Sequence, residues 1–230
     1  MKKILLVLLT LCLLCSLIAC DKGDDPETND TTPETNDALS ETEWKAMISD
    51  DVLANYTVMM EGKMSVTENG VADGSGEQNI KQIIKVANNM LSIEMFVDGE
   101  SVEPIVLEGD LAAKQNEQAT QLFKIMLAKY DAFTYDKEKK VYTVSEPVTI
   151  ETVLAGFSYN PDGSMVEFDV PAVIEMRDAT VTVSENGQLV SFDCDYSQSM
   201  TMSEDTVVTS GLVTWTFSDF GTTVIENSAN

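Results

Sequence analysis

The sequence predicts an α+β fold in which helices cover the apolar side of an antiparallel sheet. Apolar and polar residues alternate over long segments such as 190–202, so each strand has one apolar face and one polar, solvent-exposed face. The connections between neighbouring segments are too short for the crossover that parallel strands require. One mid-chain segment, 119–130, repeats its apolar residues at helical spacing, so it must pack on another apolar surface.

The first 19 residues have the pattern of a cleaved targeting segment. Lys2 and Lys3 precede an apolar run that is shorter than the roughly 20 residues of a membrane-spanning helix. The stretch Leu17-Ile18-Ala19-Cys20 resembles the lipobox of bacterial lipoproteins, which implies cleavage before Cys20 and a diacylglyceryl group on its thiol. Two acyl chains are enough for stable anchoring. We therefore expect residues 1–19 to be a lipoprotein signal peptide and the rest to lie outside the cytoplasm, anchored to the cell membrane.

Residues 20–39 are expected to be the lipidated cysteine and a disordered tether. From Asp21 to Asp37 the chain has acidic residues, Thr, Asn, Pro and Gly but no large apolar residue. A flexible chain of about 20 residues has an end-to-end distance of about 25 Å, so the domain can stand away from the bilayer. The acidic run after Cys20 also resembles the surface-export signals of some Gram-negative lipoproteins. The alternative interpretation is a solvated tether, and the envelope type stays open.

The chain is strongly acidic after cleavage. Loss of Lys2 and Lys3 leaves 12 of the 14 basic side chains against 39 acidic ones, a formal charge of −27. Like charge disfavours nucleic acid and anionic lipid headgroups, so no nucleic-acid partner is expected. We interpret the acidity as a solvated exterior, with an acidic site for a cationic partner as the alternative.

Residues 40–230 are expected to form one domain held together by its core. Of the four cysteines, Cys194 is the one that stays free after cleavage and acylation, so no intramolecular disulfide forms. A chain of this length buries roughly 70% of its unfolded surface, which is enough for an independent domain.

The first half of this domain is predicted to be a helix followed by a meander. Ser40 and Glu43 have capping-box spacing, and the helix that they begin should end near Asn55. Asn69-Gly70 and Asp98-Gly99 have the residues that tight hairpin turns require. The strands joined in this way are predicted over 56–66, 80–86, 91–97 and 102–107.

The second half is predicted to be a helix followed by further strands. The helix spans 119–130, and a hairpin joins 133–135 to 141–144. Residues 147–159 fit either a short helix or a strand. The remaining strands are expected over 179–183, 190–202 and 207–217, with a last short strand through Val224.

In this order of elements the chain resembles the LolA-like and LppX-like fold of lipoprotein and lipid carriers. The resemblance spans about 40–225, and it is carried by the lead helix running into Asn55-Tyr56-Thr57, by the mid-chain helix and by the ending Thr216 to Ile225. It implies a strongly curved, incomplete antiparallel barrel with two or three helices covering its concave face. LolA itself is a soluble shuttle, whereas this chain is expected to be anchored, so the resemblance does not imply free shuttling.

The residue inventory argues against catalysis. The chain has no histidine, which removes Ser-His and Cys-His nucleophile systems and most zinc sites. Cys194 lies between Phe192 and Tyr196 on an apolar strand face, where a thiol is usually a small hydrophobe. Paired carboxylates could hydrolyse glycans, but no pair can be singled out. We expect no enzymatic activity, no metal site and no cofactor.

The expected function is binding of a hydrophobic ligand, a lipid or an acyl chain, in a concave apolar cavity. The chain has 12 methionines, whose flexible thioethers suit an adaptable cavity, although they also fill ordinary cores. The alternative function is a cell-envelope protein–protein interaction module with a closed core. The candidate ligand-binding residues are Trp44, Met60, Met95, Phe123, Met126, Phe192, Tyr196 and Trp215.

Overall fold

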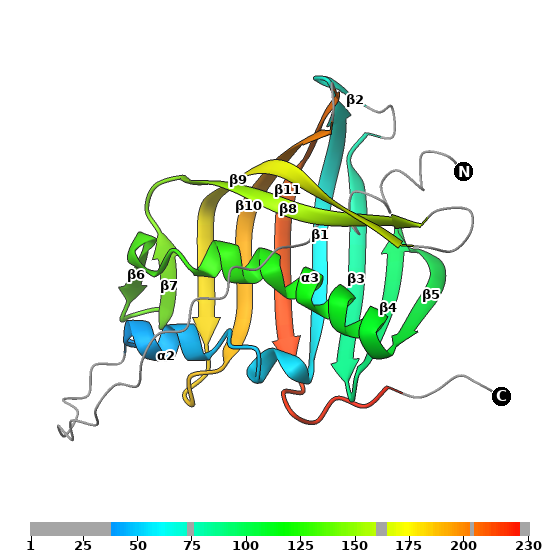
Figure 1. The fold of residues 1–230 in the computed structure, drawn as a ribbon. Coiled ribbons are helices and arrows are strands. Elements are labelled where there is room, and N and C mark those ends of the chain that lie inside the picture. The colour runs from blue at the N-terminus through cyan, green and yellow to red at the C-terminus, as the bar shows by residue number, and fades with distance from the viewer. Residues whose placement is uncertain (1–37, 73–75, 160–164, 203–204, 226–230) are drawn as a thin grey trace.

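The computed structural model describes residues 38–72, 76–159, 165–202 and 205–225 (Figure 1). These residues form one antiparallel sheet of eleven strands with two α-helices. The strands are β1 (Tyr56–Glu68), β2 (Val71–Ala72), β3 (Gln78–Ala87), β4 (Met90–Val97), β5 (Glu100–Glu108), β6 (Phe133–Asp136), β7 (Val141–Val144), β8 (Val148–Tyr159), β9 (Met165–Val183), β10 (Leu189–Met202) and β11 (Asp205–Ser218). The helices are α2 (Glu41–Ala46) and α3 (Gly109–Leu127), with the 3-10 turns η1 (Val52–Ala54) and η2 (Tyr130–Ala132).

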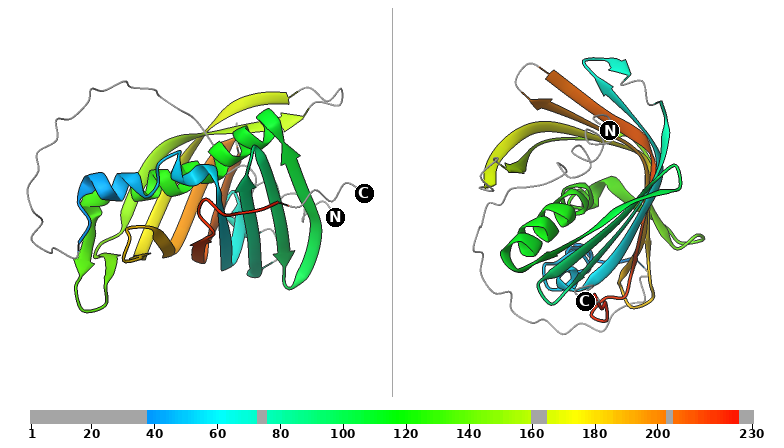
Figure 2. Two further views of the ribbon diagram at one scale, coloured as in Figure 1. Left: turned by 90° about the horizontal axis from the view of Figure 1, so that it is seen from below. Right: turned by 90° about the vertical axis from the view of Figure 1, so that its right-hand side faces the viewer.

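The sheet is curved and open. Its strand order is β5-β4-β3-β1-β11-β10-β9-β7-β6, with β2 on β1 and β8 on β9. The end strands β5 and β6 do not pair with each other in the described chain. Figure 2 shows the sheet curling around α3, while β8 and the first half of β9 form an arm that reaches over the same side. The predicted α+β fold with an antiparallel sheet is confirmed at this level.

The predicted hairpin turns are confirmed. Asn69 and Gly70 have φ angles of 52° and 75°, and Asp98 and Gly99 have φ angles of 50° and 84°. These left-handed conformations are the ones that two-residue hairpins need, and Asn, Asp and Gly adopt them at the least steric cost. The turns therefore set the register of β1 with β2 and of β4 with β5.

The capping box at the start of α2 is present, but the helix is shorter than predicted. The Ser40 amide donates to the Glu43 carboxylate over 2.8 Å, and hydrogen bonds from Ser40 hold the pKa of that carboxyl below its usual value. The helix ends at Ala46, so the prediction of one helix to Asn55 is wrong. Ser49, Asp50 and Asp51 follow, and such side chains compete for backbone hydrogen bonds in helix interiors.

Helix α3 begins at Gly109, well before the predicted start at Ala119. Its first half has polar residues on the side that faces the domain, which hides the helical period. Asn116 donates to the Leu53 carbonyl over 3.0 Å, and the Tyr56 hydroxyl donates to Asn116 over 3.2 Å. These bonds satisfy polar groups that would otherwise be costly to bury.

The structure also decides the expectations for residues 147–159 and for the C-terminal strand through Val224. Residues 147–159, which fitted either element, form the strand β8, paired with β9 along its whole length. The last short strand through Val224 is wrong. There the Thr223 amide donates to the Asn55 side chain over 2.9 Å, so a side chain takes the place of a strand partner.

The apolar core lies between the sheet and the helices. In the described part of the chain it is one large cluster of buried side chains from residues between Leu39 and Phe220, with a smaller cluster beside it. A chain of residues 38–230 therefore keeps all of this described core. Within the described parts of the chain, no helix is long and apolar enough to cross a membrane.

Candidate ligand-binding face

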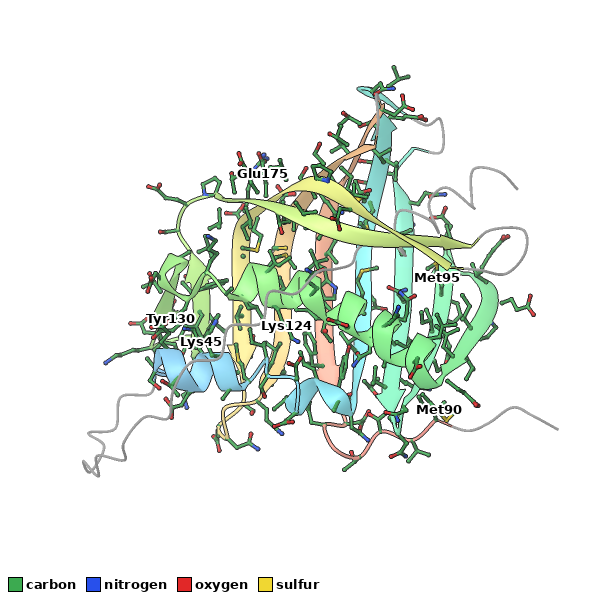
Figure 3. All side chains as sticks on the ribbon, viewed as in Figure 1. Lys45, Met90, Met95, Lys124, Tyr130 and Glu175 are labelled. Carbon is green, nitrogen blue, oxygen red and sulfur yellow. The ribbon has the colours of Figure 1, made fainter. Side chains whose placement is uncertain are left out.

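All eight candidate residues point to the concave side of the sheet and belong to one apolar cluster. None is more than 6% exposed. Figure 3 labels Met95 on β4 and Tyr130 after α3, which mark the two ends of this face. The candidates therefore share a surface, and in this structure they pack against one another and the helices.

Four of them lie in one row that crosses the sheet. Strand register aligns Met95 with Gln82, Gln82 with Met60, Met60 with Trp215, and Trp215 with Phe192. We call these five residues the belt. Residues more than a hundred positions apart in the chain thus form one row of four apolar side chains and one glutamine.

Helix α3 is seated on the middle of the belt. The Trp215 ring stacks on Phe192 at 5.2 Å between centroids and meets Tyr196 edge-on at 6.2 Å. From the helix side, Phe123 meets the Trp215 ring at 6.1 Å, and Met126 is fully buried nearby on the same helix. Phe192, Tyr196 and Trp215 thus lie on the part of the sheet that α3 covers, and Phe123 and Met126 are the candidates on the covering helix.

Trp44 belongs to a different group at the far end of the face. Its ring lies within 5.5 Å of Tyr130, 5.0 Å of Phe133 and 4.9 Å of Tyr142, measured between centroids. Its indole Nε1 donates to the Leu127 carbonyl over 2.6 Å. The hydrogen bond from Trp44 therefore holds the C-terminal end of α3 in place. The described ring contacts of Trp44 do not include Trp215.

A second, smaller apolar cluster lies under the arm. Its buried members are Leu154, Val170, Ala172 and Met200. Ile125 of α3 is partly buried and packs against both clusters, so it marks the seam where the helix meets the arm. This seam could not be predicted, because residues 147–159 fitted either a helix or a strand and the length of β9 was not anticipated.

Two surface hollows lie away from the concave face. One, of about 690 Å³, is on the outer face of β3, β1, β11 and β10, where Leu212 is 68% exposed between charged residues such as Lys63 and Asp195. The other, of about 430 Å³, lies beside Leu39 and Tyr142, where the chain enters the domain. Neither includes any of the eight candidate residues.

The acidic side chains of β10 form a solvated surface. Asp193 accepts hydrogen bonds from Thr214 over 2.6 Å and from Ser191 over 3.3 Å. In the residues that the structure describes, no three acidic or thiol side chains are grouped to hold a metal ion. The Asp193 carboxylate thus has ordinary hydroxyl partners on the outer side of the sheet.

Cys194 lies on the core face of β10, as the alternation predicted. It is 4% exposed. Burial, followed by the charges of Asp195 and Asp193, raises the pKa of the thiol to about 12. A thiol in this state is not a nucleophile near neutral pH.

Cys194 is expected to resist thiol reagents in the folded protein and to react fully after unfolding, which an Ellman assay with and without guanidinium measures. Because the folded pKa lies above the ordinary value, the unfolded state loses the thiol proton first. Stability relative to a Cys194→Ala variant should therefore fall as pH rises from about 9 to about 12. Rapid modification of the native protein at neutral pH would contradict the assignment.

No protein-family model matches the sequence, and no curated protein matches it. Function is therefore inferred from the geometry and from the chemistry of the side chains.

Proposed function

We propose that this protein is a membrane-anchored extracytoplasmic lipoprotein that binds a lipid or acyl chain between the concave face of its sheet and α3. The observation that carries the proposal is the belt with its aromatic centre, a row of four apolar residues and one glutamine inside an open, curved sheet. The function needs no covalent chemistry. Binding would come from burial, at roughly 25 cal/mol per Å² of apolar area removed from water.

The fold supports the same proposal. An open antiparallel sheet with helices inside its curve is what the resemblance to LolA-like and LppX-like carriers implies (Figure 2). The anchor at Cys20 completes the proposal and rests on the lipobox resemblance alone.

Helix α3 is suited to act as a lid because its described hydrogen bonds run mainly to the segment that precedes the sheet. Asn116 bonds the Leu53 carbonyl, the Leu127 carbonyl accepts from Trp44, and Lys124 pairs with Asp50. Toward β11, its described ring contacts are apolar, as at Phe123, while Tyr56 of β1 makes a polar contact with Asn116. Apolar contacts can be exchanged for a ligand's acyl chain without leaving polar groups unpaired.

Residues 38–230, produced without the anchor, are expected to co-purify with about one host lipid per chain. Native mass spectrometry and organic extraction would measure the stoichiometry and identify the lipid class. A protein that carries no lipid and takes up none when lipid is added would contradict the proposal.

A matched pair of α3 variants tests where the lipid sits. Ile125→Asn places an amide at the seam, whereas Ala113→Asn places the same amide on the exposed side of the helix. Lipid loading should fall in the first variant and stay unchanged in the second. Equal loading in both would place the ligand elsewhere.

The outer hollow favours a second candidate function, an envelope protein–protein interaction module. Its exposed Leu212 lies between Lys63 of β1 and Asp195 of β10, so it would fit an apolar side chain next to groups of both charges. Under this alternative the concave face is a closed core. A lipid-free protein in the extraction experiment would favour it.

A further inference from the structure

Two polar side chains interrupt the apolar concave face outside the belt. Gln198 on β10 and Thr209 on β11 are register partners, and they are 0% and 5% exposed. Both face inward, since the alternating neighbours Tyr196, Met200 and Val207 are also buried. Among the described residues, the Gln198 side-chain nitrogen and the Thr209 hydroxyl are the buried side-chain polar atoms that have no hydrogen-bond partner.

The orientation of the Gln198 amide follows from its one described bond. The Tyr196 hydroxyl donates to the Gln198 carbonyl oxygen, which leaves both amide hydrogens directed elsewhere. A buried polar group without a partner destabilises a protein, so native structures rarely keep one without a use. Two such groups are register partners on adjacent strands, and both can donate a hydrogen bond.

This pair lies where the two apolar clusters meet. Gln198 is aligned with Ile174 of the large cluster, and the next inward residue, Met200, belongs to the cluster under the arm. Six residues along β10 separate Gln198 from Phe192 in the belt, a distance of about 20 Å in a strand. A bilayer core of about 30 Å is two acyl chains thick, so one chain of about 15 Å fits between the pair and the belt.

We propose that Gln198 and Thr209 bind the carbonyl oxygen of an uncharged acyl ester whose chain runs along the face toward the belt. The Gln198 amide and the Thr209 hydroxyl would both donate to that oxygen. This assignment rests on the proposed lipid-binding function and specifies its ligand class.

The ligand is an ester rather than a free carboxylate because the buried part of the described chain has no lysine or arginine. A carboxylate buried without a cationic partner is far costlier than a neutral carbonyl with two donors. A pure hydrocarbon has no acceptor, so it would leave the Gln198 and Thr209 donors without a hydrogen-bond partner.

The test measures binding of methyl palmitate, hexadecane and palmitate to residues 38–230 by displacement of an apolar fluorescent dye. Methyl palmitate should bind about tenfold more tightly than hexadecane, the factor expected for the exchange of one or two neutral hydrogen bonds. Palmitate at pH 8 should bind more weakly than the ester. Equal affinity for ester and hydrocarbon, or tighter binding of palmitate, would overturn the assignment.

Gln198→Met and Thr209→Val are expected to remove the preference for the ester while hexadecane affinity stays unchanged. Ser92→Ala is the control, since Ser92 is a buried polar residue of β4 at 9% exposure outside the belt, and this variant should keep the preference. Thr209→Val is nearly isosteric, so the test holds even where the methionine variant alters packing.

The outcomes separate the two proposals. A wild-type chain that binds ester and hydrocarbon alike, or variants that keep the ester preference, would mean that the pair serves only a buried water, and would overturn this inference alone. A chain that binds none of the three probes would overturn the lipid-binding function as well.

Discussion

Replacing Gly211 with alanine is expected to destabilise the domain by about 3 kcal/mol, at the upper end of what overpacking costs. A Cβ atom at this position would lie 1.9 Å from the Lys63 carbonyl oxygen and 2.9 Å from the Met64 Cα atom. Both are backbone atoms of the paired strand β1, so no rotamer change relieves the clash. Relief requires β1 and β11 to separate at the centre of the sheet. Urea denaturation of the variant measures the change in the free energy of unfolding.

The control for Gly211 is its neighbour Leu212. That side chain is 68% exposed on the outer face, so Leu212→Ala should change the free energy of unfolding by no more than about 0.5 kcal/mol. A Gly211→Ala variant as stable as Leu212→Ala would show that the two strands separate there at little cost. In that case the close approach of β1 and β11 would contribute little to the stability of the domain.

Replacing Trp44 with alanine is expected to cost about 3–5 kcal/mol, the range for a large buried aromatic side chain. The Trp44 ring is 0% exposed and contacts Tyr130, Phe133 and Tyr142. Its loss also leaves the Leu127 carbonyl at the end of α3 without its indole donor. Guanidinium denaturation followed by circular dichroism measures the change.

A Trp44→Phe variant separates packing from hydrogen bonding. It keeps an aromatic ring in the cluster and removes the donor to Leu127, so we expect a loss of about 1–3 kcal/mol, which is the cost of an unpaired buried group. If Trp44→Ala cost no more than Trp44→Phe, the aromatic cluster would contribute little. The bond to Leu127 would then be the main role of Trp44.

Most of the sheet could be predicted from the sequence because strand alternation and turn residues are local signals. The turns at Asn69-Gly70 and Asp98-Gly99 are examples, and each is present in the structure. The start of α3 could not be predicted because residues such as Asn116 and Thr120 are polar on its inner side, and their partners lie far away in the chain or one turn back. A helical period read from apolar residues misses such a segment.

The sequence predicted which residues share the candidate face but not how they are arranged on it. Alternation indicated which residues of β1, β10 and β11 point inward, and the candidates do share one face. The row of Met60, Trp215 and Phe192 depends on the register of β1 with β11, which are far apart in the chain and have no connecting turn to fix it. Gln198 had a detectable signal, since it is a polar residue at an inward position of β10.

The two end strands of the open sheet differ from the strands between them in ways that oppose aggregation. Strand β6 has only four residues, so it offers little backbone to a second chain. Strand β5 is longer, but Pro104 has no amide hydrogen and lies at a shift in the β4–β5 register. The exposed carboxylates of Glu100, Glu103 and Glu108 would repel one another if two copies met along this strand. These features oppose polymerisation of the open sheet through its two end strands.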